Sequence, residues 1–154
     1  MNWDWRNDGK DHINIFSRGQ TDLGRWLSNF SPMPDHGPIK TPYSNFHTIE
    51  GYWYWLGIRD ERLRTCDGQT AKHIGKYFDG DIKMLPIQEF RNLICDAITY
   101  KITRSKLLSA ALRDSSLPLA HYYVFKGRMQ PAGYKWLVDH IENVRKQLQE
   151  SKDA

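Results

Sequence analysis

The sequence TIEGYWYWLGI, residues 48–58, places apolar side chains at the three- and four-residue intervals of an α-helix, with Ile49, Trp53 and Leu56 in register. Thr48 stands where an N-cap would, so its hydroxyl is expected to accept a hydrogen bond from the first turn. Aromatic residues occupy the other faces as well, which leaves this helix apolar nearly all round. We therefore expect it to be buried at the centre of the domain.

Glu50 is the one acidic residue inside this apolar helix and lies in its first turn. Burial would raise the pKa of its carboxyl, whereas the positive end of the helix dipole would lower it. A carboxylate between aromatic walls suits a reaction with an oxocarbenium-like transition state, because it can stabilise positive charge or activate the attacking water. The same position is also common for a glutamate that binds the free amides of the first turn. The pattern fits both interpretations equally.

Short strands and further helices are predicted on both sides of this helix. Strands are expected at residues 13–16, near residue 39 and at 119–125, and helices at 69–77, 86–103, 105–112 and 132–149. An apolar stripe from Ile87 to Ile102 should face the core. These elements predict an α+β fold, a predominantly helical single domain with a small β-sheet over residues 1–154, in which residues 1–10 are loosely ordered.

The composition is that of a globular protein, with 40% hydrophobic and 26% charged residues in 154 positions. Aromatic residues make up 13% of the chain, and they can fill a core or form flat walls for bases and sugars. The formal net charge of +4 is compatible with a ligand that carries phosphate. It is too small to indicate nucleic-acid binding by itself.

Several classes of site and location are disfavoured by the sequence. Cys66 and Cys95 lie far apart and outside any metal-ligand spacing, so we expect reduced thiols and no metal. The dinucleotide-binding, P-loop, nucleophile-elbow and zinc-protease motifs are absent, and we expect no cofactor. The polar N-terminal segment and the lack of a long apolar run predict a cytoplasmic protein with no membrane span.

Two polar clusters stand out near the N-terminus, in what we expect to be turns after short strands. Arg18 offers a planar fork of donors for phosphate, while Asn29 and Phe30 offer an amide and a ring face beside Ser28. Spacing alone favours a purely structural interpretation. In that case Asn29 holds a turn, Arg18 pairs with a surface acid and Phe30 belongs to the core.

A third cluster is predicted at residues 121–127, where Tyr122 and Tyr123 must point to opposite sides of a strand. Lys126 and the following glycine would either contact phosphate or simply end the strand. Lys72 is a further candidate cation, or a solvated helix lysine.

Three segments together resemble the motifs of the NADAR (YbiA-like) family, in the same order and at similar spacing. They are FSRGQTDLGRWLSNF at residues 16–30, with the Ser-Asn-Phe triplet at its end, IEGYWYWL at 49–56 and AKHIG at 71–75. The resemblance covers roughly the first half of the chain. It implies an α+β, YbiA-like fold and an N-glycosidase, an enzyme that hydrolyses the bond between a base and ribose.

Substrates known for this family include phosphoribosylated pyrimidine intermediates of riboflavin synthesis and ADP-ribosylated guanine in nucleic acid. By resemblance, the expected ligand is therefore a phosphorylated ribosyl base or an ADP-ribosyl group, with nucleic acid as a carrier of the modified base. The resemblance makes Glu50 the catalytic carboxylate. It also implies a set of substrate-binding residues, namely Arg18, Ser28, Asn29, Phe30, Trp53, Lys72, Gly75 and Tyr123.

Two departures from the family pattern motivate an alternative function. Gly57 stands where related enzymes often carry lysine, and residues 121–127 replace an Asp-containing, Gly-rich segment. The alternative is a non-catalytic module that binds a nucleotide or ADP-ribose. A third hypothesis is that the basic surface docks nucleic acid, in which case affinity should fall steeply with salt.

Overall fold

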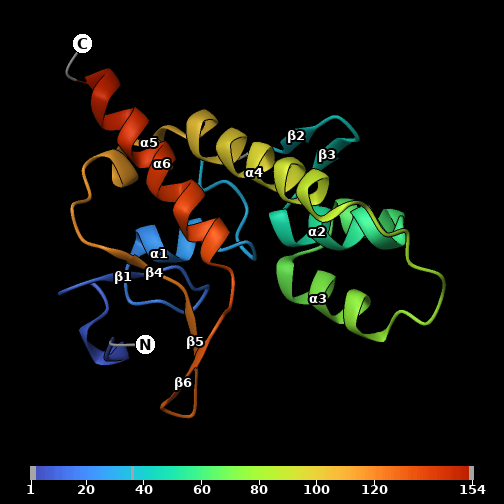
Figure 1. Ribbon diagram of the computed structural model, residues 1–154, viewed down its shortest axis with the longest axis horizontal. Helices are drawn as coiled ribbons and strands as arrows, with labels where there is room; N and C mark the ends of the chain where they lie inside the picture. Colours follow the sequence, from blue (N-terminus) through green and yellow to red (C-terminus); the bar gives the residue numbers. More distant parts are fainter. Residues whose placement is uncertain (1–2, 36, 153–154) are drawn as a thin grey trace. The chain divides into compact units, whose positions relative to one another are not determined.

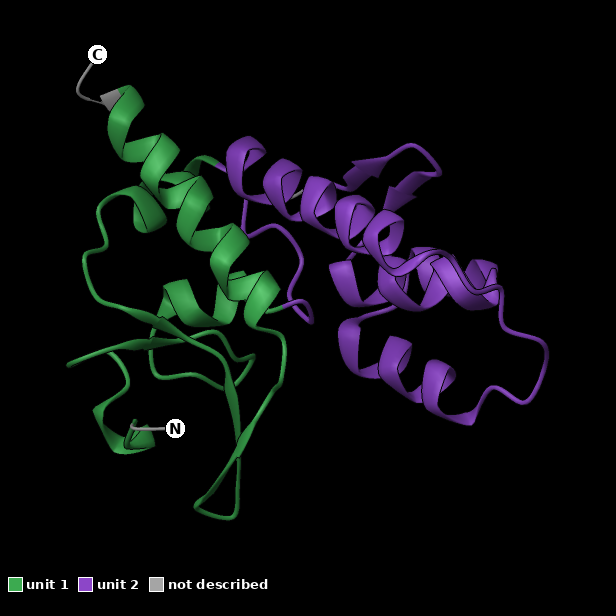
Figure 2. Ribbon diagram, in the orientation of Figure 1, with its two compact units in different colours: residues 1–28, 106–154 green, residues 29–105 purple. Residues whose placement is uncertain are grey.

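The computed structural model of the protein describes residues 3–35 and 37–152 (Figure 1). Its contacts divide the chain into two compact units, residues 1–28 with 106–154 (unit 1) and residues 29–105 (unit 2), which are coloured separately in Figure 2. Unit 2 is continuous in sequence, whereas unit 1 is assembled from both ends of the chain. The expected extent of one domain over residues 1–154 stays a prediction.

Unit 2 is built around helix α2 (Ile49–Ile58), as its sequence predicts. Helices α3 (Gly68–Tyr77) and α4 (Ile87–Arg104) both contact α2, and the 3-10 helix η2 (Glu61–Arg64) follows it. A Cβ at Gly51 would lie 2.3 Å from the carbonyl oxygen of Leu63, so only glycine lets η2 approach α2 this closely. On α2, the buried positions include Ile49, Tyr52, Trp55 and Leu56, which confirms the expected central helix.

A short antiparallel hairpin completes unit 2, with strands β2 (Ile39–Thr41) and β3 (Ser44–Phe46). Ile39 pairs with Phe46, and both side chains are fully buried. The expected stripe on α4 is confirmed at Ile94, Ile98 and Ile102 but is wrong at Ile87, which is 64% exposed. Ile87 is the first residue of α4, where the helix has not yet reached the core.

Unit 1 combines the N-terminal segment with the last third of the chain. Strand β1 (Ile13–Asn14) pairs in parallel with β4 (Leu119–Ala120), and β5 (Tyr122–Phe125) forms an antiparallel hairpin with β6 (Arg128–Pro131). Helices α1 (Asp22–Leu27), α5 (Lys106–Arg113) and α6 (Lys135–Lys152) supply the helical part. Helix α5 contacts both α1 and α6.

The N-terminal segment of unit 1 carries local structure that the sequence analysis did not assign. Trp5–Asn7 form the 3-10 helix η1, capped by the carboxylate of Asp4, and Asp8 is buried behind it. Residues 1 and 2 lie outside the described residues. The looseness expected for residues 1–10 stays a prediction.

The fold class is confirmed as α+β and mainly helical, with corrections at three places. The strand structure consists of three separate two-stranded sheets among the described residues rather than one small sheet. The strand expected at residues 119–125 is broken at His121 into β4 and β5. Helix α1 and strands β3 and β6 were not predicted, because each is shorter than the window in which periodicity is visible.

Candidate functional site

The candidate site in unit 2 begins at the N-terminus of α2, where Thr48 is the cap. Its hydroxyl oxygen accepts a hydrogen bond of 3.0 Å from the amide of Gly51. The Glu50 carboxylate, by contrast, accepts no hydrogen bond and forms no ion pair with any residue in the described ranges 3–35 and 37–152. The interpretation of Glu50 as a group that binds first-turn amides is therefore wrong, because Thr48 performs that role.

Glu50 is half-buried, and its surroundings change its acidity. Burial raises the pKa of the Glu50 carboxyl to about 7, and the positive charge of Lys72 opposes part of this rise. Burial is thus the dominant influence on the pKa. A carboxyl with such a pKa is divided between its protonated and ionised forms near neutral pH, which is the condition that suits proton transfer.

Three of the expected site residues lie together around this carboxyl. The amide of Glu50 donates a hydrogen bond of 2.9 Å to the carbonyl oxygen of Asn29, which fixes the chain before Phe30 beside α2. The ammonium nitrogen of Lys72 lies 5.6 Å from the centre of the Phe30 ring. Because Lys72 also acts electrostatically on Glu50, the carboxyl, the cation and the ring share one neighbourhood.

Gly68 makes this neighbourhood possible, although the sequence analysis did not single it out. A Cβ at Gly68 would lie 2.4 Å from the Cα of Phe30, so the first residue of α3 rests directly on the Phe30 backbone. The only local signal was a glycine immediately after the helix cap Asp67. Such a signal does not reveal a contact with a residue far away in the sequence.

Two further expected residues lie on the same helices. Trp53 follows Glu50 by three positions and therefore lies on the same side of α2, where its half-buried ring meets Phe90 edge-on at 4.9 Å. A Cβ at Gly75 would lie 2.2 Å from the Tyr54 ring, so this glycine allows α3 to pack on α2. A contact between Gly75 and a substrate stays a prediction.

The remaining expected residues belong to unit 1. Ser28 is buried at the end of α1, so the triplet that it opens follows a helix and not a strand, contrary to expectation. Tyr123 is on β5 with 36% of its surface exposed, and its neighbour Tyr122 is buried, as strand alternation predicts. The assembly of Arg18, Ser28 and Tyr123 into one site with Glu50 stays a prediction.

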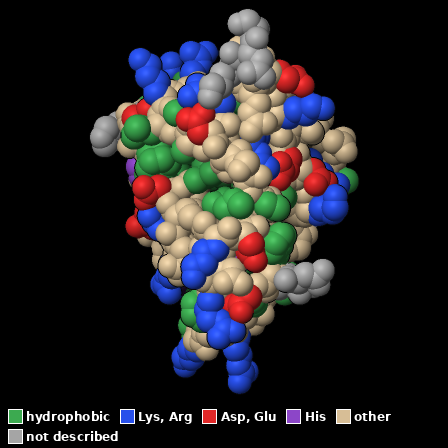
Figure 3. Space-filling model, turned by 90° about the vertical axis from the view of Figure 1, so that its left-hand side faces the viewer, with side chains coloured by type: hydrophobic (Ala, Val, Ile, Leu, Met, Phe, Trp, Pro, Cys, Tyr) green, Lys and Arg blue, Asp and Glu red, His purple; other side chains and the backbone are tan. Residues whose placement is uncertain are grey.

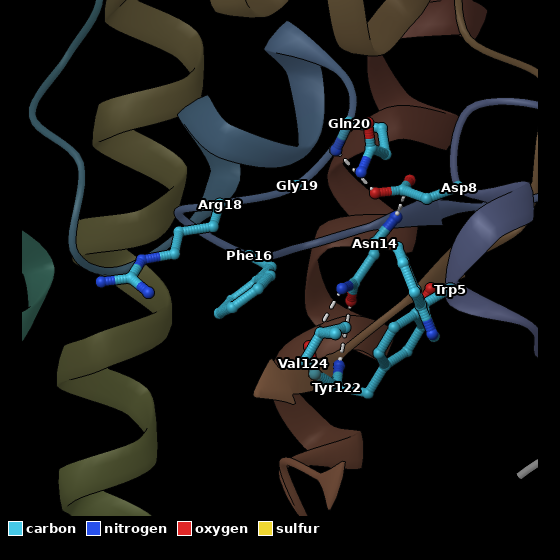
Figure 4. Close-up of a pocket in the computed structure, with 9 residues that line it drawn as sticks. All are labelled: Trp5, Asp8, Asn14, Phe16, Arg18, Gly19, Gln20, Tyr122 and Val124. Carbon is cyan, nitrogen blue, oxygen red and sulfur yellow. Dashed lines mark hydrogen bonds between the residues drawn. The ribbon is translucent and has the colours of Figure 1, made fainter. Parts of the chain in front are cut away.

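Arg18 lines a cavity of about 180 Å³ in unit 1 (Figure 4). The floor of this cavity is a fixed polar network, in which the Asp8 carboxylate accepts hydrogen bonds from the amides of Asn14 and Gln20 at 2.9 and 2.8 Å. Figure 4 shows the guanidinium of Arg18 directed away from this network. Arg18 forms no ion pair with another described residue, so pairing with a surface acid is not the role it has here.

A larger cavity, about 340 Å³, lies in unit 2 beside the β2–β3 hairpin. Met33 and Phe46 form buried parts of its lining, and His47, Arg64 and Thr65 add polar groups. The Arg64 guanidinium is already engaged, since it donates a hydrogen bond of 2.6 Å to the carbonyl oxygen of Tyr43. No sequence pattern predicted this cavity.

The described residues contain no group of three or more His, Cys, Asp or Glu side chains that could hold a metal ion. Cys66 and Cys95 are free and half-buried, as expected from their spacing. Among the helices that the structure describes, none has the length and apolar character needed to cross a membrane.

Comparison with known proteins gives one informative match. No protein-family model matches the chain, and no curated protein matches it. The NMR structure of the E. coli protein YbiA superposes with a TM-score of 0.67, over 92% of this chain and 86% of that chain, at 20% sequence identity. Identity this low establishes the architecture and not the activity. The chain therefore has the YbiA-like fold that its motifs predict.

Proposed function

We propose that this protein is an N-glycoside hydrolase, with Glu50 as its catalytic carboxylate. Its substrate would be a phosphoribosylated or ADP-ribosylated base. The observation that carries this proposal is the state of Glu50. It is a half-buried carboxyl with a pKa of about 7, it accepts no hydrogen bond within the described residues, and it lies beside a cation and an aromatic ring.

The chemistry follows from what each group near Glu50 offers. The bond between the base and the anomeric carbon breaks, the electron pair leaves with the base, and positive charge develops on the sugar. The ionised Glu50 carboxylate stabilises that charge and accepts a proton from the water that attacks the anomeric carbon. The base takes up a proton from solvent and Glu50 afterwards returns its proton to solvent, so atoms and charge balance.

Binding is assigned to the residues around the carboxyl. The rings of Phe30 and Trp53 offer faces on which a base can stack, and the exposed ammonium of Lys72 offers a charge for phosphate. Arg18 in unit 1 has an exposed guanidinium without an acidic partner among the described residues, and its contact with phosphate stays a prediction.

The test is release of free base, followed by mass spectrometry. Wild type, Glu50→Gln and a matched control, Glu89→Gln, are incubated with riboflavin-pathway intermediates, NAD, ADP-ribose and ADP-ribosylated guanine DNA. Glu89 is a suitable control because it is also a first-turn glutamate but is exposed on α4. We expect release by wild type and the control, and a loss of at least about a hundredfold in Glu50→Gln. Full turnover by Glu50→Gln would contradict the proposal.

One observation favours the alternative of a module that binds without cleaving. At Gly57 a Cβ would lie 3.0 Å from Ile82, and the Gly57 carbonyl oxygen accepts a hydrogen bond of 2.7 Å from the amide of Lys83. Position 57 itself therefore carries no cation and is covered by the loop before α4. Saturable binding of ADP-ribose by calorimetry, without any released base after long incubation, would establish this alternative.

A further inference from the structure

The β5–β6 hairpin in unit 1 exposes one face to solvent. Its register pairs Tyr123 with Gln130 and Phe125 with Arg128, and these four side chains share the outer face because alternate strand residues point the same way. All four are exposed, and Phe125 has 65% of its surface accessible. Large exposed aromatic side chains on a hairpin without a covering element call for a functional explanation.

The hairpin also concentrates positive charge. Lys126 and Gly127 form its turn, with φ angles of 51° and 74°, so both central residues are in the left-handed region of a type I′ turn. The Lys126 ammonium lies 5.4 Å from the centre of the Phe125 ring. Residues 115–138 contain no aspartate or glutamate. Figure 3 shows Lys and Arg side chains gathered at the lower end, where Figure 1 places the hairpin turn.

Aromatic rings continue from this face in both directions. Phe16 meets Tyr123 edge-on at 6.0 Å, and His121 lies 5.8 Å from Tyr123 and 6.2 Å from Tyr134, which is itself 38% exposed. Burial lowers the pKa of His121 to about 4, so its ring is neutral at neutral pH and adds an aromatic surface without charge. The result is a row of rings with cations along one edge.

We infer that the outer face of the β5–β6 hairpin binds single-stranded nucleic acid, with bases stacked on Tyr123 and Phe125 and phosphates held by Lys126 and Arg128. Aromatic faces combined with cations are the usual platform for unpaired strands, because every base has a flat face and every nucleotide a phosphate. A duplex hides its base faces, and a peptide made of acidic residues alone has no ring faces to stack on these residues. The inference is independent of hydrolysis at Glu50.

Unit 2 contains a matched control for this surface. Tyr77 is also 65% exposed, and the ammonium of Lys76 lies 5.5 Å from its ring, almost as Lys126 lies from Phe125. The sequence after Tyr77, however, brings Asp79 and Asp81. A lysine–aromatic pair next to two acids should repel phosphate. A variant of Tyr77 therefore distinguishes non-specific binding to exposed aromatic residues from binding to a nucleic-acid surface.

The experiment measures fluorescence anisotropy of a labelled oligothymidylate with the full chain at several salt concentrations. Phe125→Ala should weaken binding about tenfold or more, as expected for one lost base stack, while Tyr77→Ala should change it less than twofold. Lys126→Asn should weaken binding. It should also reduce the slope of log affinity against log salt concentration by about 1, as expected for the loss of one phosphate contact. Because asparagine tolerates a positive φ, this variant removes the charge while preserving the turn.

The inference would be overturned by no binding at low salt, by equal losses from Phe125→Ala and Tyr77→Ala, or by competition from polyglutamate as effective as that from unlabelled oligonucleotide. A duplex that binds as tightly as the single strand would also overturn it. Glu50→Gln should bind the oligonucleotide like wild type. Phe125→Ala should release base from a small substrate at the wild-type rate, so this proposal and the proposed hydrolysis can fail separately.

Discussion

The side chain of Asn14 bridges the break between β4 and β5 by pairing with the backbone of Tyr122. Its amide donates to the Tyr122 carbonyl oxygen and its carbonyl oxygen accepts from the Tyr122 amide, both at 3.0 Å, as the dashed lines in Figure 4 show. The Asn14 side chain thus takes the place of a backbone hydrogen-bonding partner for Tyr122, just after the point where His121 interrupts the strand. The two bonded residues are separated by 108 positions in the chain.

Asn14→Ala is therefore expected to destabilise the protein strongly. It leaves a buried amide and a buried carbonyl of Tyr122 without partners, at a cost of about 2–4 kcal/mol in the free energy of unfolding. Urea denaturation followed by circular dichroism measures this cost. Asn143→Ala, at an exposed position of α6, is the control and should change stability by less than about 0.5 kcal/mol. Equal midpoints for both variants would show that the bridge is unimportant.

The raised pKa of Glu50 predicts a specific pH dependence of stability. Its carboxyl ionises at about 7 when folded and at 4.5 as a reference value, so between these pH values the folded state binds more protons and stability falls as pH rises. Glu50→Gln lacks this titration. From pH 4.5 to 8, wild type should lose about 2–3 kcal/mol relative to Glu50→Gln, allowing for partial exposure. Parallel stability curves for the two proteins would contradict the partial burial of this carboxyl.

Lys72 should set the pH at which base release begins. Its positive charge favours the ionised form of Glu50, so Lys72→Met raises the pKa of that carboxyl further. Under the proposed mechanism, the rate of base release rises as Glu50 ionises, and the rising limb of the pH–rate profile should move to higher pH in Lys72→Met. Lys76→Met, one turn later on α3, should leave the limb in place. An unshifted limb in Lys72→Met would argue against Glu50 as the titrating base.

Gly68 is predicted to be intolerant of even one methyl group. An alanine Cβ would lie 2.4 Å from the Cα and 2.7 Å from the carbonyl oxygen of Phe30, and backbone atoms cannot move aside as a flexible side chain can. Gly68→Ala should lose about 1–3 kcal/mol of stability, although alanine is the better helix former. Gln69→Ala, at the exposed next position, provides the comparison in the same denaturation assay. A stabilised Gly68→Ala would show that α3 does not rest on Phe30.

Local sequence signals predicted the parts of the fold that depend on local interactions. The cap at Thr48 and the apolar spacing of α2 are both contained within a few residues, and both are confirmed. Helix α1 was missed for the opposite reason. Gly24 interrupts the helical pattern of α1. A Cβ there would lie 2.2 Å from the carbonyl oxygen of Asn14, so glycine is required by the neighbouring strand β1 and not by the helix itself.

The candidate site shows the same division. Glu50 was identified from its unusual place in an apolar helix. That its carboxylate accepts no hydrogen bond from the described residues follows from the Thr48 cap together with the fold around it. The approach of Lys72 to Phe30 depends on how α3 lies on the segment before α2, which no spacing within either segment encodes. Resemblance to family motifs placed these residues in one site, whereas periodicity alone did not.

The parallel pairing of β1 with β4 also has a consequence for the order in which the protein folds during synthesis. Ile13 pairs with Leu119, so the N-terminal strand emerges from the ribosome long before its partner exists. All residues of unit 2 emerge in between as one uninterrupted segment. Contacts of such high sequence separation form slowly, because the intervening chain must be closed into a loop first. Strand β1 therefore forms its native pairing late in synthesis, and until then this strand needs protection from aggregation.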